Sequence, residues 1–342
     1  MENKHTIGDL YQMQSLPLHA KIRMTERRIE GWIDEFGEDG VYISFSGGKD
    51  STVLMDIIRN RMRCNIPAVF VNVPTQYPEL KDFAKTWDNV EIISPKISFM
   101  EVCERYGFPL ISKEVAHKMS DWESAHRNGR ESYVDRQFEG RYKTKNGKTN
   151  MINISNYAFL KEAPFSISHQ CCNYLKKNPV HKYSKETGRK PITAQMAQES
   201  QLRLNAWLKE GCNAFNNKNP ISNPMSFWTE QDILTYIHTY QLPICSVYGR
   251  VVEDYEAEGL LENQMTFDDF KEDRLYKTTG QKRTGCMLCG FGCHMKGDER
   301  FLILKESHPK MYSLLDIVKN KGITFREAIE WTNEHGNLNI KL

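Results

Sequence analysis

A short loop of glycines and small polar residues is the part of this chain best suited to chemistry. Residues 46–51 are Ser-Gly-Gly-Lys-Asp-Ser, and they lie between an apolar run at residues 41–45 and a helical pattern at residues 52–63. Glycines let backbone N–H groups approach an anion closely, and a helix N-terminus favours negative charge. A strand that runs through such a turn into a helix predicts a nucleotide phosphate site.

Cysteines are the second group of residues suited to chemistry. Cys171 and Cys172 are adjacent, Cys286 and Cys289 form a C-x-x-C pair, and Cys293 follows closely. Four thiolates from two such segments can hold one zinc ion or a [4Fe–4S] cluster, and a lone C-x-x-C is also a redox motif. Adjacent cysteines chelate one zinc awkwardly because their side chains diverge, whereas the corners of a four-iron cube are more widely spread. The spacing alone leaves these alternatives open.

The glycine loop is not a Walker A loop, which needs four residues between its first glycine and a Gly-Lys-Ser or Gly-Lys-Thr. It resembles the loop of the N-type ATP pyrophosphatases, the PP-loop superfamily, whose members cleave ATP between the α and β phosphates. The resemblance implies that Lys49 neutralises the leaving group and that Asp50 positions Mg²⁺ or the helix start. It also implies a pyrophosphate site made by the N–H groups and hydroxyls of Ser46, Gly47, Gly48 and Ser51.

The order of motifs along the chain resembles the phosphoadenosine phosphosulfate (PAPS) reductase family over residues 40–295. After the loop come the Cys-Cys pair, Pro-Ile-Thr-Ala-Gln at 191–195, Asn-Pro-Met-Ser-Phe-Trp at 223–228 and Gly-Cys-x-x-Cys at 285–289. In cluster-bearing members of that family, a Cys-Cys pair and a later C-x-x-C hold a [4Fe–4S] cluster. The resemblance therefore implies a cluster, with zinc as the alternative, bound by Cys171, Cys172, Cys286 and Cys289.

Two departures from the family pattern leave the substrate open. Sulfonucleotide reductases use a cysteine near the C-terminus as the nucleophile, and no cysteine follows Cys293 here. Cys293 is therefore the candidate to take over that role or to carry a persulfide, and His294 beside it could lower its pKa. Residues 71–75 are Val-Asn-Val-Pro-Thr, where many relatives have Asp-Thr-Gly, so Asn72 of the nucleotide site keeps a hydrogen-bonding group but loses a charge.

Alternating strand and helix patterns are expected to position the loop. A helical pattern at residues 22–36 ends at Gly37, and apolar runs at 41–45, 68–73 and 90–93 alternate with helical patterns at 52–63, 78–87 and 98–105. This alternation predicts an α/β fold, a doubly wound parallel sheet that binds ligands beyond the carboxyl ends of its strands. The resemblance implies the adenine nucleotide α hydrolase-like PP-loop fold with helical additions at both ends. Helix-capping patterns begin at Thr229 and at Thr324.

Length and composition indicate an enzyme-sized globular protein. The chain has 342 residues, of which 39% are hydrophobic and 26% charged, and single cores stop growing near about 250–300 residues. We expect a helical segment at 1–38, a nucleotide-binding domain at 39–245 with a basic insertion near 118–150, and a cysteine-containing helical region at 246–342. The absence of a long apolar run or secretory signal predicts no membrane partner and a cytoplasmic location. Nine cysteines then favour metal, cluster or catalytic roles over disulfides.

These features predict an enzyme that uses ATP and Mg²⁺, forms AMP and pyrophosphate, carries a [4Fe–4S] cluster and transfers sulfur to a nucleic acid or nucleotide. In design it resembles the DNA phosphorothioation sulfurtransferase. Basic stretches at 127–148 and 176–190 favour DNA or tRNA as the acceptor, although the net charge of +2 gives no global signal. A cysteine desulfurase is a candidate sulfur donor. Two alternatives stay open: a sulfonucleotide reductase acting on a small molecule, and a non-catalytic nucleotide- or redox-sensing subunit.

Overall fold

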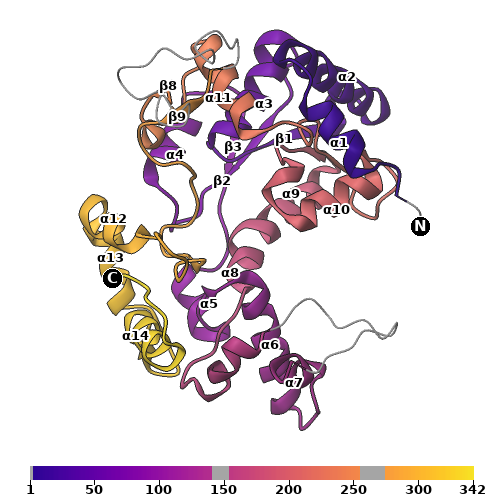
Figure 1. The fold of residues 1–342 in the computed structure, drawn as a ribbon. Helices are drawn as coiled ribbons and strands as arrows, with labels where there is room; N and C mark the ends of the chain where they lie inside the picture. The colour runs from indigo at the N-terminus through magenta and orange to yellow at the C-terminus, as the bar shows by residue number, and fades with distance from the viewer. Residues whose placement is uncertain (1–2, 141–153, 255–273) are drawn as a thin grey trace, which may run out of the picture. The chain divides into compact units, whose positions relative to one another are not determined.

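The computed structural model describes residues 3–140, 154–254 and 274–342 (Figure 1). The chain divides into two compact units. Unit 1 comprises residues 1–72, 77–93 and 180–284, and unit 2 comprises residues 73–76, 94–179 and 285–342. This division differs from the three consecutive segments expected from the sequence, because the strands that complete the central sheet come from both sides of a long intervening segment.

Unit 1 is built on a six-stranded sheet in the order β3-β2-β1-β5-β7-β6. All neighbours are parallel except β6 and β7, which pair antiparallel. The chain runs outward from β1 through β2 to β3 and then returns to place β5 on the other side of β1, which creates the topological switch point of a doubly wound sheet. The predicted fold class is thus confirmed. The strands are β1 (Val41–Phe45), β2 (Ala68–Val71), β3 (Val90–Ile93), β5 (Lys190–Ile192), β6 (Asn213–Ala214) and β7 (Ile221–Ser222).

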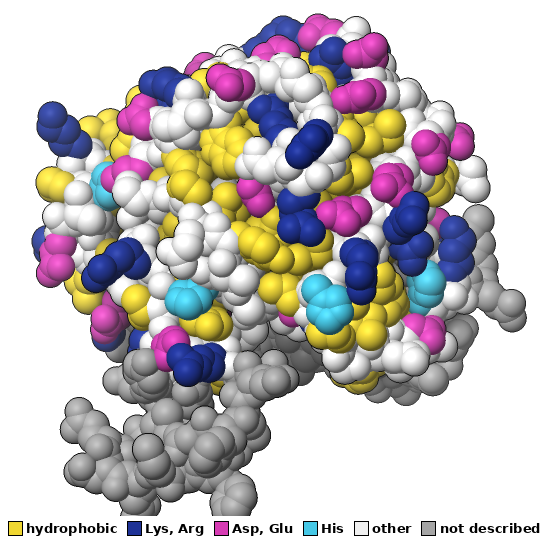
Figure 2. All heavy atoms as spheres, turned by 90° about the horizontal axis from the view of Figure 1, so that it is seen from above, with side chains coloured by type: hydrophobic (Ala, Val, Ile, Leu, Met, Phe, Trp, Pro, Cys, Tyr) yellow, Lys and Arg dark blue, Asp and Glu magenta, His cyan; other side chains and the backbone are white. Residues whose placement is uncertain are grey.

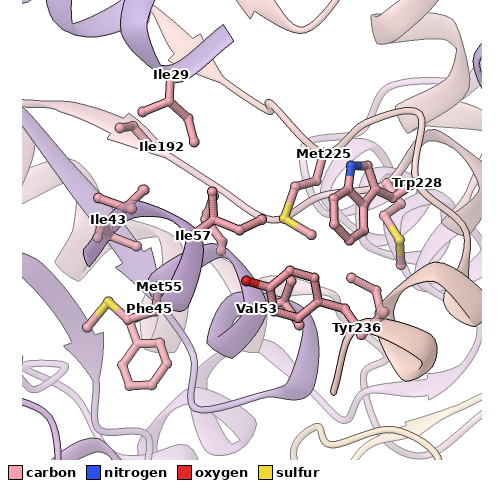
Figure 3. Packing of buried hydrophobic residues seen from close by; sticks show 14 of the residues in the cluster. Ile29, Ile43, Phe45, Val53, Met55, Ile57, Ile192, Met225, Trp228 and Tyr236 are labelled. Carbon is pink, nitrogen blue, oxygen red and sulfur yellow. The ribbon is translucent and has the colours of Figure 1, made fainter. Parts of the chain in front are cut away.

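Alternate residues of β1 pack against opposite faces of the sheet, as the two-residue period of a strand requires. Ile43 and Phe45 join the main core on one face, whereas Tyr42 packs with Val69 and Tyr183 on the other. The main core includes residues from β1, α3 and α11, and Figure 3 shows these side chains packed together. Both faces of β1 are therefore covered, which fixes the strand that leads into the glycine loop.

The helices of unit 1 follow the apolar periodicity of their sequences. The pattern expected at 22–36 lies within α2, which ends at Gly37 in a left-handed conformation with φ of 76°. The helix expected after the glycine loop begins at Lys49 and continues as a π-helical turn. The helices and small strands are α1 (Ile7–Gln14), α2 (Leu18–Phe36), α3 (Lys49–Asp56), the π turn (Ile57–Arg61), α4 (Pro78–Ala84), α10 (Gln201–Glu210), α11 (Glu230–Thr239), β8 (Val251–Glu253) and β9 (Tyr276–Thr278).

Unit 2 is mostly helical. Its elements are α5 (Phe99–Tyr106), α6 (Lys113–Arg127), α7 (Tyr133–Phe138), a 3₁₀ helix (Ser155–Glu162), α8 (Gln170–Cys172), a π turn (Asn173–Lys177), α12 (Arg300–Ser307), α13 (Pro309–Tyr312) and α14 (Phe325–Gly336). Two short strands, β4 (Leu110–Ile111) and β10 (Gly290–Phe291), pair in parallel, and β11 (Lys319–Asn320) and β12 (Ile323–Thr324) form a hairpin. Helix α9 (Asn178–Thr187) begins in unit 2 and continues into unit 1.

Side-chain contacts tie the C-terminal part of unit 2 to its earlier helices. The rings of Phe108 and Phe325 stack with centroids 4.8 Å apart. The Asn320 side chain accepts from Ser166 N at 2.7 Å and donates to Cys103 O at 2.9 Å. The capping box predicted at Thr324 is present at the start of α14. No helix in the described part of the chain is long and apolar enough to cross a membrane.

Candidate functional site

The glycine loop lies in unit 1, between the carboxyl end of β1 and the first turn of α3. Gly47 has φ of 71°, which favours glycine. A Cβ atom at Gly47 would lie 3.0 Å from the carbonyl oxygen of Leu80, so the close approach of the backbone also requires a residue without a side chain. The loop thus has the backbone conformation that the sequence predicted for an anion site.

Two serine hydroxyls hold the shape of the loop. Ser46 N donates to Ser51 Oγ at 3.2 Å, and Gly48 N donates to Ser46 Oγ at 3.3 Å. Ser51 Oγ donates in turn to Gly48 O at 2.9 Å. The hydroxyls predicted to contact pyrophosphate therefore satisfy the loop's own backbone in this structure, and they would exchange these bonds for phosphate oxygens on binding.

Lys49 is the buried cation of the loop, with 3% of its surface exposed. Its Nζ donates to Lys282 O at 3.1 Å and lies 3.2 Å from Glu230 Oε1. Asp50 Oδ1 is 3.8 Å away. A buried ammonium is stable only with such partners, so Lys49 is held as a positive charge within the loop.

Asp50 fits the role of a cation ligand. Its Oδ1 atom is buried and has no hydrogen-bond partner among the described residues. Burial raises the pKa of Asp50, the neighbouring Lys49 lowers it, and Glu199 and Glu230 raise it further, with a net rise. A carboxylate oxygen without a hydrogen-bond partner beside a phosphate loop suits Mg²⁺, which prefers oxygen ligands from carboxylates and phosphates.

Asn72 lies just beyond β2, the strand next to β1, and its N–H donates to Ile93 O at 2.8 Å. It therefore continues the parallel ladder to the same edge of the sheet as the loop.

Several residues around the loop were not predicted as site residues. Tyr248 is 2% exposed, and its hydroxyl lies 2.7 Å from Thr284 Oγ1. A Cβ atom placed on Gly48 would come 3.2 Å from the Tyr248 hydroxyl, so this side chain lies directly against the loop. Glu230 was recognised only as an acidic residue in the first turn of a helix. Nothing in its spacing relates it to Lys49, because sheet topology creates that contact.

The four predicted cysteine ligands lie in unit 2. Cys171 and Cys172 end the short helix α8, and the C-x-x-C turn is held by a hydrogen bond from Cys289 N to Cys286 O at 3.1 Å. Met287 N within that turn donates to Thr75 O at 2.7 Å. The pKa of the Cys171 thiol is raised by a hydrogen bond with Cys172, by burial and by the nearby charges of Cys289 and Cys286. The structure therefore brings the two distant cysteine pairs into one neighbourhood.

Lysines surround this cysteine neighbourhood. A hydrogen bond from Cys171 lowers the pKa of Cys172, burial opposes this change, and Lys113, Lys176 and Lys177 lower the pKa further. Burial alone would lower the pKa of Lys176, but the nearby thiols of Cys286 and Cys172 raise it by more. Lys176 was part of a predicted basic stretch. Its position four residues after Cys172 was the available signal, since residues spaced by four share a helix face.

The donor set fits a cluster bound by thiolates. Within residues 3–140, 154–254 and 274–342, no three His, Cys, Asp or Glu side chains are placed so that they could hold a metal ion. The fit therefore rests on the chemistry of the donor set. Four thiols with lysine counter-charges suit a group bound by thiolates, and a [4Fe–4S] cluster and zinc are both such groups.

Cys293 has the environment of an inert thiol. It is 1% exposed, its Sγ donates to Gly290 O at 2.8 Å, and burial raises its pKa to about 12. The suggested lowering of that pKa by His294 is not found, since burial lowers the pKa of His294 itself and favours its neutral form. Arg300 donates to the carbonyls of Cys289 and Phe291, which stiffens the turn containing these cysteines.

The basic insertion expected near 118–150 is described only to residue 140; residues 141–150 lie outside the described residues. The part that is described forms α6 and α7, where Arg127 lies 3.5 Å from Glu123. On the face drawn in Figure 2, Lys and Arg side chains are interspersed with Asp and Glu rather than gathered in one basic area. The described surface on that face does not concentrate positive charge.

Comparison with known protein families matches residues 40–290 to the phosphoadenosine phosphosulfate reductase domain. Among solved structures, the chain is similar to a phosphoadenylyl-sulfate (PAPS) reductase from Candida auris in complex with phosphate, with 14% identity over 72% of this chain and 92% of that chain and a TM-score of 0.36. A search of curated proteins found no match. The family match covers most of the chain, including the glycine loop and both cysteine pairs, and the chain therefore belongs to the PAPS reductase family of PP-loop enzymes.

Proposed function

We propose that this protein is an ATP-dependent enzyme that forms AMP and pyrophosphate and transfers sulfur to a nucleic-acid or nucleotide acceptor. The observation that carries the proposal is the loop at residues 46–51. A left-handed glycine, two hydroxyls and a buried ammonium lie together there at the N-terminus of α3. Such groups bind the two phosphates of a pyrophosphate leaving group and stabilise the charge that develops on it.

The first proposed step forms an adenylated acceptor. An oxygen of the acceptor attacks the α phosphorus of ATP, the bond from that phosphorus to the bridging α–β oxygen breaks, and pyrophosphate leaves. Lys49 neutralises the growing negative charge on the leaving group, and the loop N–H groups hold its oxygens. In the second step, a sulfide donor attacks the activated carbon or phosphorus, and AMP leaves with the original acceptor oxygen.

Asp50 would hold Mg²⁺ in this scheme through its buried oxygen, which lacks a hydrogen-bond partner in the described structure. The ion would neutralise phosphate charge, which is the usual contribution of Mg²⁺ to nucleotide chemistry.

The cysteine neighbourhood of unit 2 would hold a [4Fe–4S] cluster through Cys171, Cys172, Cys286 and Cys289. A bound cluster of this kind supplies electron transfer or a place to hold sulfur. The chain's own contribution is charge: the Lys176 ammonium, whose pKa Cys286 and Cys172 raise, would offset the negative charge of the thiolates.

A sulfonucleotide reductase is the second candidate, and the family match supports it. Such an enzyme attacks its substrate with a cysteine thiolate. Cys293 is the candidate for that role in this chain. It is buried and its pKa is raised, whereas a nucleophilic cysteine needs an accessible thiol with a lowered pKa. This observation favours the adenylating function over the reductase.

Product analysis of ATP with anaerobically purified protein and Mg²⁺, with and without DNA or tRNA, tests the proposal. We expect AMP and pyrophosphate in amounts that rise with nucleic acid. Lys49→Met should reduce AMP formation by about 10²–10³-fold, the usual effect of removing a group that stabilises transition-state charge. Lys85→Met is the control, because the Lys85 side chain is exposed and forms an ion pair with Asp82, away from the loop contacts described above.

Undiminished ATP turnover by Lys49→Met would remove the loop from the mechanism. Tight binding of a sulfonucleotide, with no AMP formed under any condition, would favour the reductase.

A further inference from the structure

The phosphate-binding ammonium of the loop is already occupied by a carboxylate. Lys49 Nζ lies 3.2 Å from Glu230 Oε1, while Glu230 Oε2 lies 3.9 Å from the Arg283 guanidinium. Glu230 thus faces a buried lysine with one oxygen and an exposed arginine with the other, since the Lys49 and Arg283 side chains are 4% and 65% exposed. All three residues belong to unit 1.

The position of Glu230 is set by the start of α11. Thr229 caps this helix, with a reciprocal capping box to Asp232, and Glu230 is the first helical residue. A carboxylate in the first turn is stabilised by the helix dipole. The charge of Glu230 therefore has a favourable environment whether or not Lys49 is its partner.

The other cation, Arg283, belongs to a segment that is fixed against the loop. Lys282 O accepts from Lys49 Nζ, and Thr284 Oγ1 meets the Tyr248 hydroxyl. A Cβ atom on Gly280 would lie 2.5 Å from Val247 O, so this segment packs too closely on residues 247–249 to tolerate a side chain there. The three charged groups are therefore held in one place by backbone contacts from separate elements.

We propose that Glu230 is an internal phosphate mimic, which occupies Lys49 when the loop is empty and moves to Arg283 when pyrophosphate or a nucleotide binds. This inference rests on the proposed nucleotide-binding function of the loop and adds a positioning residue to it. The exchange keeps each charge paired throughout. The buried lysine never lacks an anion, and the displaced carboxylate keeps a cation and the helix N-terminus.

The exchange has a measurable consequence, because Glu230 competes with the ligand. Removing the competing charge should tighten binding of inorganic pyrophosphate, whereas loss of an ordinary binding residue would weaken it. We expect Glu230→Gln to bind pyrophosphate about two- to fivefold more tightly than the wild type, the effect expected for loss of one partly exposed ion pair. Glu230→Asp, which keeps the charge but withdraws it from Lys49, should also bind more tightly.

The experiment is calorimetric titration of the full chain with inorganic pyrophosphate. Glu26→Gln is the matched control, since Glu26 also pairs with an arginine in unit 1, Arg61, but lies outside the loop contacts. Arg283→Gln should weaken binding about threefold in the wild type by stranding the displaced carboxylate. In the Glu230→Gln background the same change should have no effect if Arg283 acts only through Glu230.

The outcomes separate this inference from the function on which it rests. The exchange would be overturned if the wild type binds pyrophosphate and both Glu230 variants bind it with the same or lower affinity at an unchanged melting temperature. The nucleotide site itself would then remain supported. Detectable pyrophosphate binding by Glu230→Gln, with none by the wild type, would support the exchange. Failure of the wild type and both variants to bind pyrophosphate or ATP would overturn both, because the loop would then bind no phosphate.

Discussion

Lys49 shows how a candidate site residue can be recognised in the sequence while its environment cannot. The Ser-Gly-Gly-Lys-Asp-Ser pattern indicated its role, and the structure places its ammonium in the loop with 3% exposure. Its partners, Glu230 and Lys282 O, come from positions about 180 and 230 residues away in the chain. No periodicity links such positions, because they meet only through the order of strands in the sheet.

At the cysteine neighbourhood we predict that Cys171→Ala loses most of its iron. Removing one of four thiolates leaves a cluster with an incomplete ligand set. The measurement is iron and sulfide content, with visible absorption, of anaerobic preparations.

Cys103→Ala is the control, since Cys103 is a fully buried thiol of unit 2 that is not among the four proposed ligands. Full iron content in Cys171→Ala, with the spectrum unchanged, would contradict the cluster assignment.

At the glycine loop we predict that Gly47→Ala destabilises the protein by about 1–2 kcal/mol, because a Cβ atom disfavours a left-handed residue. Contact with Leu80 O adds to this effect. Urea denaturation measures it, and pyrophosphate affinity should fall as the loop shifts.

Gly31→Ala provides the matched comparison. Gly31 lies inside α2 with no atom within 4 Å of an added Cβ, so alanine should stabilise by about 0.5–1 kcal/mol. Equal effects of the two substitutions would argue against a strained loop.

Among the elements, helix α6 is joined to two other segments of unit 2 through Glu123. Glu123 Oε1 accepts from Lys321 Nζ and from Ser166 Oγ, each at 2.7 Å. Burial raises the pKa of Glu123, but the bonds from Lys321 and Ser166 outweigh this effect, so the pKa is lowered overall from its ordinary value of 4.5. The carboxylate form is thus the one that stabilises the folded state.

The Glu123 charge makes the stability of the protein depend on pH. A carboxyl group whose pKa is lower in the folded than in the unfolded state stabilises the protein above its unfolded pKa. This stabilisation is lost as the pH falls through the folded-state pKa. We predict that Glu123→Gln is less stable than the wild type by about 1 kcal/mol at pH 7. The difference should shrink below pH 4 in urea titrations, and a constant difference across pH would refute the role of this charge.

Local signals in the sequence were sufficient to predict several of the helices. Apolar periodicity predicted α2, and the predicted capping residues Thr229 and Thr324 begin α11 and α14. The basic insertion expected near residues 118–150 has few apolar residues and no apolar periodicity. Its first part belongs to α6, which buries Val115 and Met119 near its start. A helix that buries only its first turns gives little periodic signal over its polar remainder.

For the whole molecule, the division into two units was beyond sequence patterns. Neither unit is continuous: the chain passes between them after residues 72, 76, 93, 179 and 284. A proline or glycine lies within two residues of each passage, but with 13 prolines and 21 glycines in the chain such single residues do not indicate a boundary. The glycine loop and the cysteines were both recognised in the sequence, yet their assignment to different units depends on long-range contacts.

The strand order also bears on how the protein is made. On one side β1 pairs with β2, which follows it closely, but on the other side Val41 pairs with Lys190. At typical elongation rates of about 5–20 residues per second, the ribosome synthesises β5 roughly 7–30 s after β1. Throughout that interval one edge of the central strand lacks its partner, and such edges invite pairing with other chains. The interval before β5 is made is therefore the stage of synthesis at which the central strand is most open to pairing with other chains.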